Sequence, residues 1–264
     1  MADSSEFKTS VLNLIDLSSP DIGATVSLLK QACLDSGFFY VINHGIDRKF
    51  MDEVFSQSER FFSLPLEEKM KSLRNEKHRG YTPLFDQINS DLSDPGNQTN
   101  GDYKESYFIG PEISEDDEPG ANRPLRGPNR WPSSGTWQKA VARLIALALD
   151  LTADFFDKLE LMGTVRLLHY GDEISQPDKG MFGTGAHSDF GFITILAADV
   201  FGLQICKDKD AKTQVALIVN LGDMLERWSN STFRSTLHRV LDTGRERYSI
   251  ACFVVPHYDC IVEC

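Results

Sequence analysis

The chain of 264 residues is 41% hydrophobic, so it has enough apolar side chains to build the core of one large domain or two small ones. Its 39 acidic and 27 basic residues give a formal net charge of −12, which would repel both the phosphate backbone of nucleic acids and anionic membrane surfaces. This composition excludes a disordered protein, and we expect a monomer with a small-molecule partner, no nucleic acid and no membrane.

The cysteines and the N-terminus bear on the cellular compartment. No C-x-x-C pair is present, and an odd number of widely spaced cysteines argues against a disulfide framework or a zinc knuckle. The N-terminus lacks a hydrophobic signal region, and no stretch reaches about eighteen apolar residues. We therefore expect a reducing, cytoplasmic location, with the nucleus left open. The cysteines are Cys33, Cys206, Cys252, Cys260 and Cys264.

Strands and helices are predicted in the first half of the chain. Pro20 stands near the first turn of a predicted helix, Gly37 ends that helix, and Asn43-His-Gly45 is a turn signal after an aromatic, β-branched run. We interpret His44 in this turn as structural. The pattern predicts strands at 11–15, 38–42 and 102–109, and helices at 21–36, 48–64 and 137–151 with a short one from Pro65.

Two polar segments separate these elements. Residues 74–101 and 111–135 are rich in turn residues, so we expect surface loops in both. The second loop carries the acidic run 115–118, which we interpret as a solvated surface rather than an ion site.

The second half of the chain has the alternating pattern of β-strands. Many short strands at roughly ten-residue spacing are typical of a sandwich or barrel, so the expected fold is mainly β with flanking α-helices. One short helix, at 223–230, interrupts the pattern. The predicted strands are 164–170, 182–189, 192–197, 203–207, 215–220, 235–240, 248–254 and 260–262.

The stretch Gly185-Ala-His-Ser-Asp-Phe-Gly191 contains the first of two chemical motifs. On a strand, the period of two puts His187 and Asp189 on one face and Ser188 on the other. A second histidine, His238, follows about fifty residues later. Two histidines and one carboxylate form the facial triad of non-haem Fe(II) oxygenases, which leaves coordination positions open for a co-substrate and O₂.

The second motif follows His238. Arg247-Tyr-Ser249 places a guanidinium and a hydroxyl on the same face of a predicted strand, where they could hold an anion. Each motif alone arises often by chance, and a lone histidine such as His238 is more often structural. The ordered set of H-x-D, a distant histidine and R-x-S is much more specific.

Over nearly its whole length the chain resembles the plant-type, isopenicillin-N-synthase-like 2-oxoglutarate- and Fe(II)-dependent dioxygenases. Three further elements carry the resemblance: residues 37–45 (GFFYVINHG), Asp102-Tyr-Lys-Glu105 and Gly222-Asp-Met224. The resemblance implies a double-stranded β-helix, or jelly roll, flanked by N-terminal helices. We expect one integrated catalytic unit made of an N-terminal region over 1–110, a loop over 111–135 and a jelly-roll core over 136–264.

The resemblance also implies residue roles. His187, Asp189 and His238 match the iron ligands, Arg247 and Ser249 match the pair that binds the distal carboxylate of 2-oxoglutarate, and Tyr170 matches a tyrosine beside that pair. The implied reaction uses O₂ to hydroxylate or desaturate a small organic substrate, with release of succinate and CO₂ and with ascorbate as a reductant. An ascorbate-using relative stays an alternative. The substrate walls considered are Arg79-Gly-Tyr81, Tyr107-Phe108, Phe190 and Phe253, although residues of these types are more often ordinary core.

The chain departs from the family pattern in four places. Leu168 stands where the family usually has an asparagine, two residues before the tyrosine. Compared with the family, the chain is expected to lack the first turns of a helix between Gly135 and Trp137, a strand and turn between Thr213 and Ala216, and a helix after Cys264. A missing strand would expose sheet edges, so the alternative is a catalytically silent, truncated jelly-roll protein with a metal- or ligand-binding role only.

Overall fold

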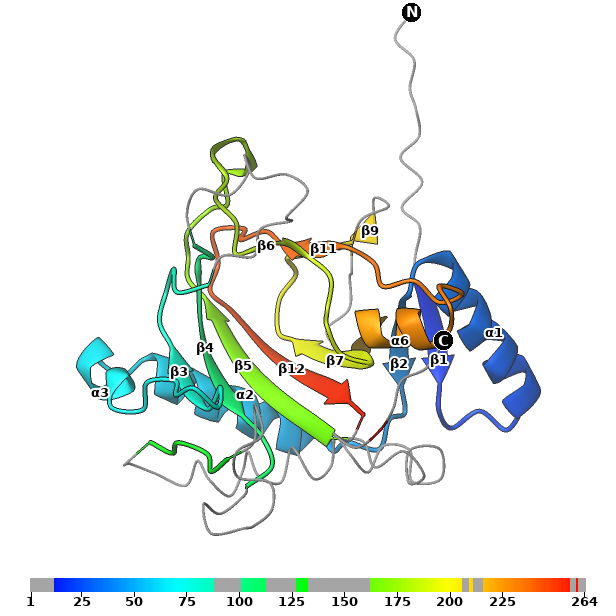
Figure 1. Cartoon of the computed structure of the whole chain (residues 1–264), viewed down its shortest axis with the longest axis horizontal. Coiled ribbons are helices and arrows are strands. Elements are labelled where there is room, and N and C mark those ends of the chain that lie inside the picture. The colour runs from blue at the N-terminus through cyan, green and yellow to red at the C-terminus, as the bar shows by residue number, and fades with distance from the viewer. Residues whose placement is uncertain are drawn as a thin grey trace, which may run out of the picture.

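The computed structural model describes residues 12–87, 101–112, 127–132, 162–205, 209–210, 216–256 and 260. Two β-sheets pack against each other in this part of the chain (Figure 1). The large sheet has the strand order β1-β2-β10-β7-β12-β5-β4-β3, and the small sheet has the order β6-β11-β8-β9. The expected jelly-roll core with flanking helices is confirmed.

The strands of the large sheet come from both halves of the chain. The N-terminal half supplies β1 (Asn13–Asp16), β2 (Phe38–Ile42), β3 (Gly80–Thr82) and β4 (Lys104–Ile109). The C-terminal half supplies β5 (Met162–Tyr170), β7 (Ile193–Ala198), β10 (Leu217–Leu221) and β12 (Arg247–Val255). The small sheet consists of β6 (Thr184–His187), β8 (Leu203–Ile205), β9 (Lys209–Asp210) and β11 (His238–Val240).

The large sheet is apolar on both faces because alternate residues of its strands enter two different cores. On β12, Ala251 faces the small sheet, whereas Ile250 and Cys252 face the opposite side. On β5, Leu168 and Tyr170 likewise face the small sheet, and Val165 and Leu167 face away from it. The cavity described below therefore lies on the face that carries the even-numbered residues of β5.

Helices cover the outer face of the large sheet. Helix α2 (Arg48–Phe62) lies along β5 and β12 in Figure 1 and buries Val54, Phe61 and Phe62 against them. Its N-terminus is capped by Asp47, whose side chain accepts a hydrogen bond from the amide of Phe50. The other helices of the described ranges are α1 (Ile22–Asp35), α3 (Leu66–Met70) and α6 (Asp223–Trp228), with a 3₁₀ turn at Pro177–Lys179.

Most of the predicted strands and helices are found within a few residues of their expected positions. Strand β3 was not predicted, since it lies in the polar segment interpreted as a loop, where Tyr81 pairs with Tyr107 of β4. Strand β6 ends at His187, so the predicted strand over 182–189 was too long. The helix at 137–151, the strand at 260–262, the run 115–118 and the three expected deletions lie wholly or partly outside the described residues. The division into segments at 111–135 stays a prediction.

No helix in the described ranges is both long and apolar enough to cross a lipid bilayer.

The core on the outer face provides a test of the fold. We expect Leu167→Ala to lower the free energy of unfolding by about 2–5 kcal/mol, because the Leu167 side chain is 0% exposed between β5 and α2. Leu66→Ala is the matched control: Leu66 is 59% exposed, and its truncation should change the stability by less than about 0.5 kcal/mol. Urea denaturation followed by circular dichroism measures both values, and equal losses would contradict this packing.

Candidate metal and anion site

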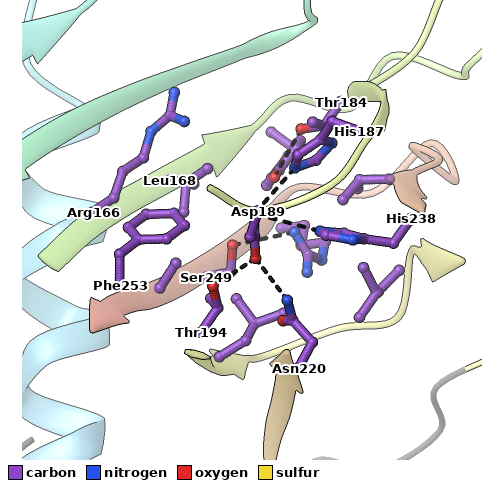
Figure 2. Close-up of a pocket in the computed structure, with 16 residues that line it drawn as sticks. Arg166, Leu168, Thr184, His187, Asp189, Thr194, Asn220, His238, Ser249 and Phe253 are labelled. Atoms are coloured by element: carbon purple, nitrogen blue, oxygen red, sulfur yellow. Dashed lines mark hydrogen bonds and ion pairs between the residues drawn. The ribbon is translucent and has the colours of Figure 1, made fainter. Parts of the chain in front are cut away.

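Two histidines meet where the small sheet faces the large one. His187 is the last residue of β6 and His238 the first of β11, and these two residues are paired across the strands with ring centroids 4.3 Å apart. Asp189 follows just beyond the end of β6. Its Oδ1 atom lies 3.6 Å from Nε2 of His187 and 3.8 Å from Nε2 of His238 (Figure 2). The three predicted ligands thus offer atoms within 4.8 Å of one another.

Each imidazole is held in one tautomer by the backbone. Nδ1 of His187 lies 2.8 Å from the carbonyl oxygen of Gly185, and Nδ1 of His238 lies 3.1 Å from that of Thr236. A carbonyl oxygen can only accept a hydrogen bond, so Nδ1 carries the proton in both rings. The Nε2 lone pairs then point toward the space beside Asp189, as metal ligation requires.

The two oxygens of Asp189 have different environments. Oδ2 accepts hydrogen bonds from Oγ1 of Thr194 at 2.5 Å and from Nδ2 of Asn220 at 2.7 Å. Thr194 and Asn220 are paired neighbours on β7 and β10 of the large sheet. These two bonds orient the carboxylate so that Oδ1 faces the histidines (Figure 2).

A glycine is required behind this carboxylate. A Cβ atom at position 222 would lie 2.1 Å from the carbonyl oxygen of Gly191, so another residue at 222 would push the two segments apart. Next to Gly222, the amide of Asp223 donates a hydrogen bond of 2.8 Å to the carbonyl oxygen of Asp189. The Gly222-Asp-Met224 element therefore supports the segment that carries Asp189.

The charge states suit a metal ligand set. Burial lowers the pKa of His187 to about 4, and the nearby His238 adds to this effect, so the His187 imidazole is neutral at pH 7. Burial alone would raise the pKa of Asp189, but His238, His187 and the hydrogen bonds to its carboxylate lower it overall. Neutral imidazoles and an ionised carboxylate are the forms that bind a cation.

The donor atoms fit iron in particular. Two imidazole nitrogens and one carboxylate oxygen on one side of a cavity correspond to the facial arrangement of non-haem Fe(II) sites, and the set lacks the thiolates that structural zinc sites usually use. The residues present therefore fit an Fe(II) ion.

A cavity opens beside the three ligands, and it contains the predicted anion pair. Arg247 at the start of β12 is 3% exposed, and its Nη1 donates a hydrogen bond of 3.2 Å to Oγ of Ser249. The aromatic ring of Tyr170 lies 4.7 Å from the guanidinium carbon, and the Tyr170 hydroxyl lies 3.2 Å from Oγ1 of Thr184. The cavity thus brings Arg247, Ser249 and Tyr170 together with His187, Asp189 and His238.

The rest of the cavity lining is largely apolar. The space measures about 510 Å³ when the solvent in its open mouth is counted. Leu168 lies among the lining residues, so an apolar side chain occupies the position where the family usually has asparagine. The other lining residues are Arg166, Thr184, Thr194, Leu196, Leu203, Asn220, Val240, Ala251 and Phe253.

The Asp102-Tyr-Lys-Glu105 motif supports the site without entering the cavity. Oδ1 of Asp102 accepts a hydrogen bond of 3.0 Å from the amide of Gly185 on β6, and its Oδ2 is paired with Lys104. Glu105 points to the outer face of the sheet, where it binds Lys69 at 2.6 Å and the Tyr81 hydroxyl at 2.5 Å. Asp102 thereby fixes β6, the strand that carries His187.

The candidate substrate walls are mostly ordinary core or surface residues, as their interpretation from the sequence favoured for the core. Phe253 lines the cavity, but Tyr81 and Tyr107 pack against Phe61 of α2 on the other face of the sheet, and Phe190 is 72% exposed. Sequence reasoning also missed Thr194 and Asn220, which orient Asp189. The other polar lining residues that it missed are Thr184 and Arg166. Alternate residues of β5 share the face of Tyr170, so the two-residue period of the strand could have identified Arg166.

Comparisons with known proteins agree with this site. The family model for the N-terminal region of non-haem dioxygenases in morphine synthesis matches residues 12–134, and that of the 2OG-Fe(II) oxygenase superfamily matches residues 163–256. Azadirone synthase of Melia azedarach is 44% identical, over 96% of this chain and 84% of that protein. Kihadalactone A synthase of Citrus sinensis is 40% identical, over 98% of this chain and 85% of that protein.

A solved structure agrees as well. The crystal structure of a full-length Neurospora crassa protein in complex with alpha-KG, which is 2-oxoglutarate, covers 98% of this chain and 89% of its own chain, with a TM-score of 0.78 and 30% identity. The chain therefore belongs to the plant-type 2-oxoglutarate- and Fe(II)-dependent dioxygenases, enzymes that use both cofactors and O₂ to oxidise a small organic metabolite.

Proposed function

We propose that His187, Asp189 and His238 bind the catalytic Fe(II), and that Arg247, Ser249 and Tyr170 bind 2-oxoglutarate. The observation that carries this proposal is the convergence of Nε2 of His187, Nε2 of His238 and Oδ1 of Asp189 in the cavity that also holds the buried Arg247. When bound, the iron supplies the O₂-dependent oxidation that accompanies decarboxylation of 2-oxoglutarate to succinate. The protein's residues orient the reactants and keep water out.

Arg247 has the main role in binding the co-substrate. Its planar guanidinium can form two parallel hydrogen bonds with the distal carboxylate of 2-oxoglutarate. The carbonyl oxygen of Val200 accepts from Nε at 3.2 Å and the ring of Tyr170 stacks on the guanidinium, so the donors at the other end are held in place. Ser249 accepts from Nη1, which leaves its hydroxyl hydrogen free to donate to the same carboxylate.

The substrate is a largely apolar metabolite that is hydroxylated or desaturated. The lining by Leu168, Leu196, Leu203 and Phe253 supports this class, since such walls exclude water and favour an apolar body. The two relatives with the highest identities reported above are named as synthases of azadirone and kihadalactone A, so a compound related to these products is the first to test. Succinate and CO₂ formed in proportion to product would separate this function from that of an ascorbate-using relative.

The protein acts as a cytoplasmic monomer without nucleic-acid or membrane partners. The net charge of −12 supports the absence of nucleic acid and of anionic membranes as partners. The thiols of Cys33, Cys252 and Cys260 are free, which is compatible with a reducing compartment.

No observation favours the silent, truncated alternative. Its argument was that loss of a strand could change the register that brings His238 to the other ligands. Strand β11 instead pairs His238 with His187, and β10 pairs in register with β7 and β2.

The first prediction concerns iron. We expect His187→Ala to lower the iron content of anaerobically purified protein at least about tenfold, because one of three ligands is lost. His44→Ala is the control, since His44 lies in a turn where its Nδ1 contacts the amide of Ile46, outside the cavity. Metal analysis measures both proteins, and unchanged iron in His187→Ala would rule out this ligand assignment.

The second prediction concerns the orientation of Asp189. Thr194→Val keeps the shape of the side chain but removes the hydroxyl that donates to Oδ2, so we expect a loss of about 10–100-fold in Fe(II) affinity. Thr194→Ser keeps the hydroxyl and should bind iron close to the parent level. An anaerobic Fe(II) titration gives both affinities, and equal affinity in the parent and Thr194→Val would show that this hydrogen bond is not needed.

The third prediction concerns 2-oxoglutarate. Arg247→Lys keeps the charge but cannot form two parallel hydrogen bonds, so we expect binding to weaken about tenfold or more. Arg239→Lys is a matched control, because Arg239 also stacks on an aromatic ring and binds a side-chain amide but lies outside the cavity lining. Calorimetry on the metal-loaded protein tests this, and equal binding by the Arg247→Lys variant and the parent protein would refute the assigned role.

A further inference from the structure

A second buried arginine, Arg166, lines the cavity from the centre of β5. Its side chain shares the inward face of the strand with Leu168 and Tyr170, and the residue is 9% exposed. In the register of the sheet, Arg166 pairs with Ala251, whereas Tyr170 pairs with Arg247. Four residues along a strand correspond to roughly 13 Å, so the two guanidinium groups belong to different parts of the cavity.

The hydrogen bonds of Arg166 go to neutral groups, and the carboxylates of Asp102 and Asp189 act on its charge without touching it. Nη2 donates to Oγ of Ser106 at 2.9 Å and to the side-chain oxygen of Gln87, which are neutral acceptors, and the ring of Phe108 lies 4.5 Å from the guanidinium carbon. Nε is buried and has no partner. Within the described ranges, no carboxylate is in ion-pair contact with Arg166.

Other buried cations of the same region differ in this respect. Lys69 is paired with Glu105, and Lys104 is paired with Asp102. Burial lowers the pKa of Arg166 to about 10, so the group is still a cation at neutral pH. A buried charge without a carboxylate in direct contact is costly, and a buried donor without an acceptor adds to that cost. Arg247 is the comparable case in this cavity, and its expected partner is the carboxylate of 2-oxoglutarate.

The side chains beside Arg166 restrict which ligand could accept a hydrogen bond from its guanidinium. Leu168 and Phe253 line the same part of the cavity, and in the view of Figure 2 they lie between Arg166 and Asp189. A ligand reaching from the metal ligands to the guanidinium would therefore contact apolar side chains along its length and a hydrogen-bond donor at its end.

We propose that Arg166 anchors the organic substrate by binding an oxygen acceptor, a carboxylate or a carbonyl group, on an otherwise apolar molecule. This inference rests on the proposed function, since it assumes that iron and 2-oxoglutarate occupy the rest of the cavity. It assigns Arg166 the selection and orientation of the substrate, with the apolar body of the substrate directed toward the metal ligands.

Three probes with the same apolar body test this role: 4-phenylbutanoate, its methyl ester and butylbenzene. Each is titrated into the full chain loaded with Fe(II) and 2-oxoglutarate without O₂, and binding is followed by ligand-observed NMR. We expect the parent to bind at least one oxygen-bearing probe ten times or more tightly than butylbenzene. Preference for the acid alone would identify a carboxylate, and similar binding of acid and ester would identify a carbonyl oxygen.

Variants separate this role from a structural one. Arg166→Leu should lose the preference for the oxygen-bearing probes, whereas Arg239→Leu, which removes a guanidinium outside the cavity lining, should keep it. Arg166→Lys is the second variant if Arg166→Leu folds poorly, and it should keep a preference for the acid while losing that for the ester. The 2-oxoglutarate affinity of each variant, measured in the same samples, should equal that of the parent.

Three results would overturn the inference. The first is a parent that binds butylbenzene as tightly as the acid and the ester, or binds none of the probes. The second is an unchanged preference in Arg166→Leu. The third is loss of 2-oxoglutarate binding in both Arg166 variants, which would make the residue structural. Failure of the parent itself to bind Fe(II) or 2-oxoglutarate would instead contradict the proposed function.

Discussion

The carboxylate of Asp189 connects the two sheets at the point where the chemistry takes place. Asp189 follows β6 of the small sheet, and its Oδ2 is held by Thr194 and Asn220 on two neighbouring strands of the large sheet. Its Oδ1 faces both histidines. Because one oxygen is occupied by the protein, the other is presented as a single, directed ligand. The bonds that fix the relative position of the two sheets therefore also fix the geometry of the site.

The parts of the site that follow the two-residue period of a strand could be predicted from the sequence. Arg247 and Ser249 lie on the regular strand β12, so their shared face was predicted correctly. His187 and Asp189 also converge as predicted, although Asp189 lies beyond the end of β6. The iron and 2-oxoglutarate chemistry was predicted from the ordered set of motifs and the family resemblance. This was possible because the order of motifs along the chain can be read from a single sequence.

Features that depend on which strands are neighbours could not be predicted. The bond from Asn220 to Asp189 joins residues far apart in the sequence, and no local pattern indicates that β10 lies next to β7. Strand β3 has three residues and exists through its pairing with β4. The sequence could not decide whether Tyr81 and Tyr107 are core or substrate wall, because periodicity gives a strand two faces without stating which one borders a cavity. The family resemblance could not decide this either, since it identifies the metal and co-substrate ligands and not the residues that line the substrate cavity.

The backbone contacts of the two histidines have a consequence for the kinetics of metal uptake. Each Nδ1 atom is bonded to the carbonyl oxygen of the residue two positions earlier in its own chain segment, Gly185 or Thr236. Such a short-range contact forms with the strand itself and needs no metal. The imidazoles have therefore already lost most of their rotational entropy when an ion arrives. The incoming ion has to shed water but does not have to order its ligands, so its capture should be limited by dehydration rather than by rearrangement of the protein.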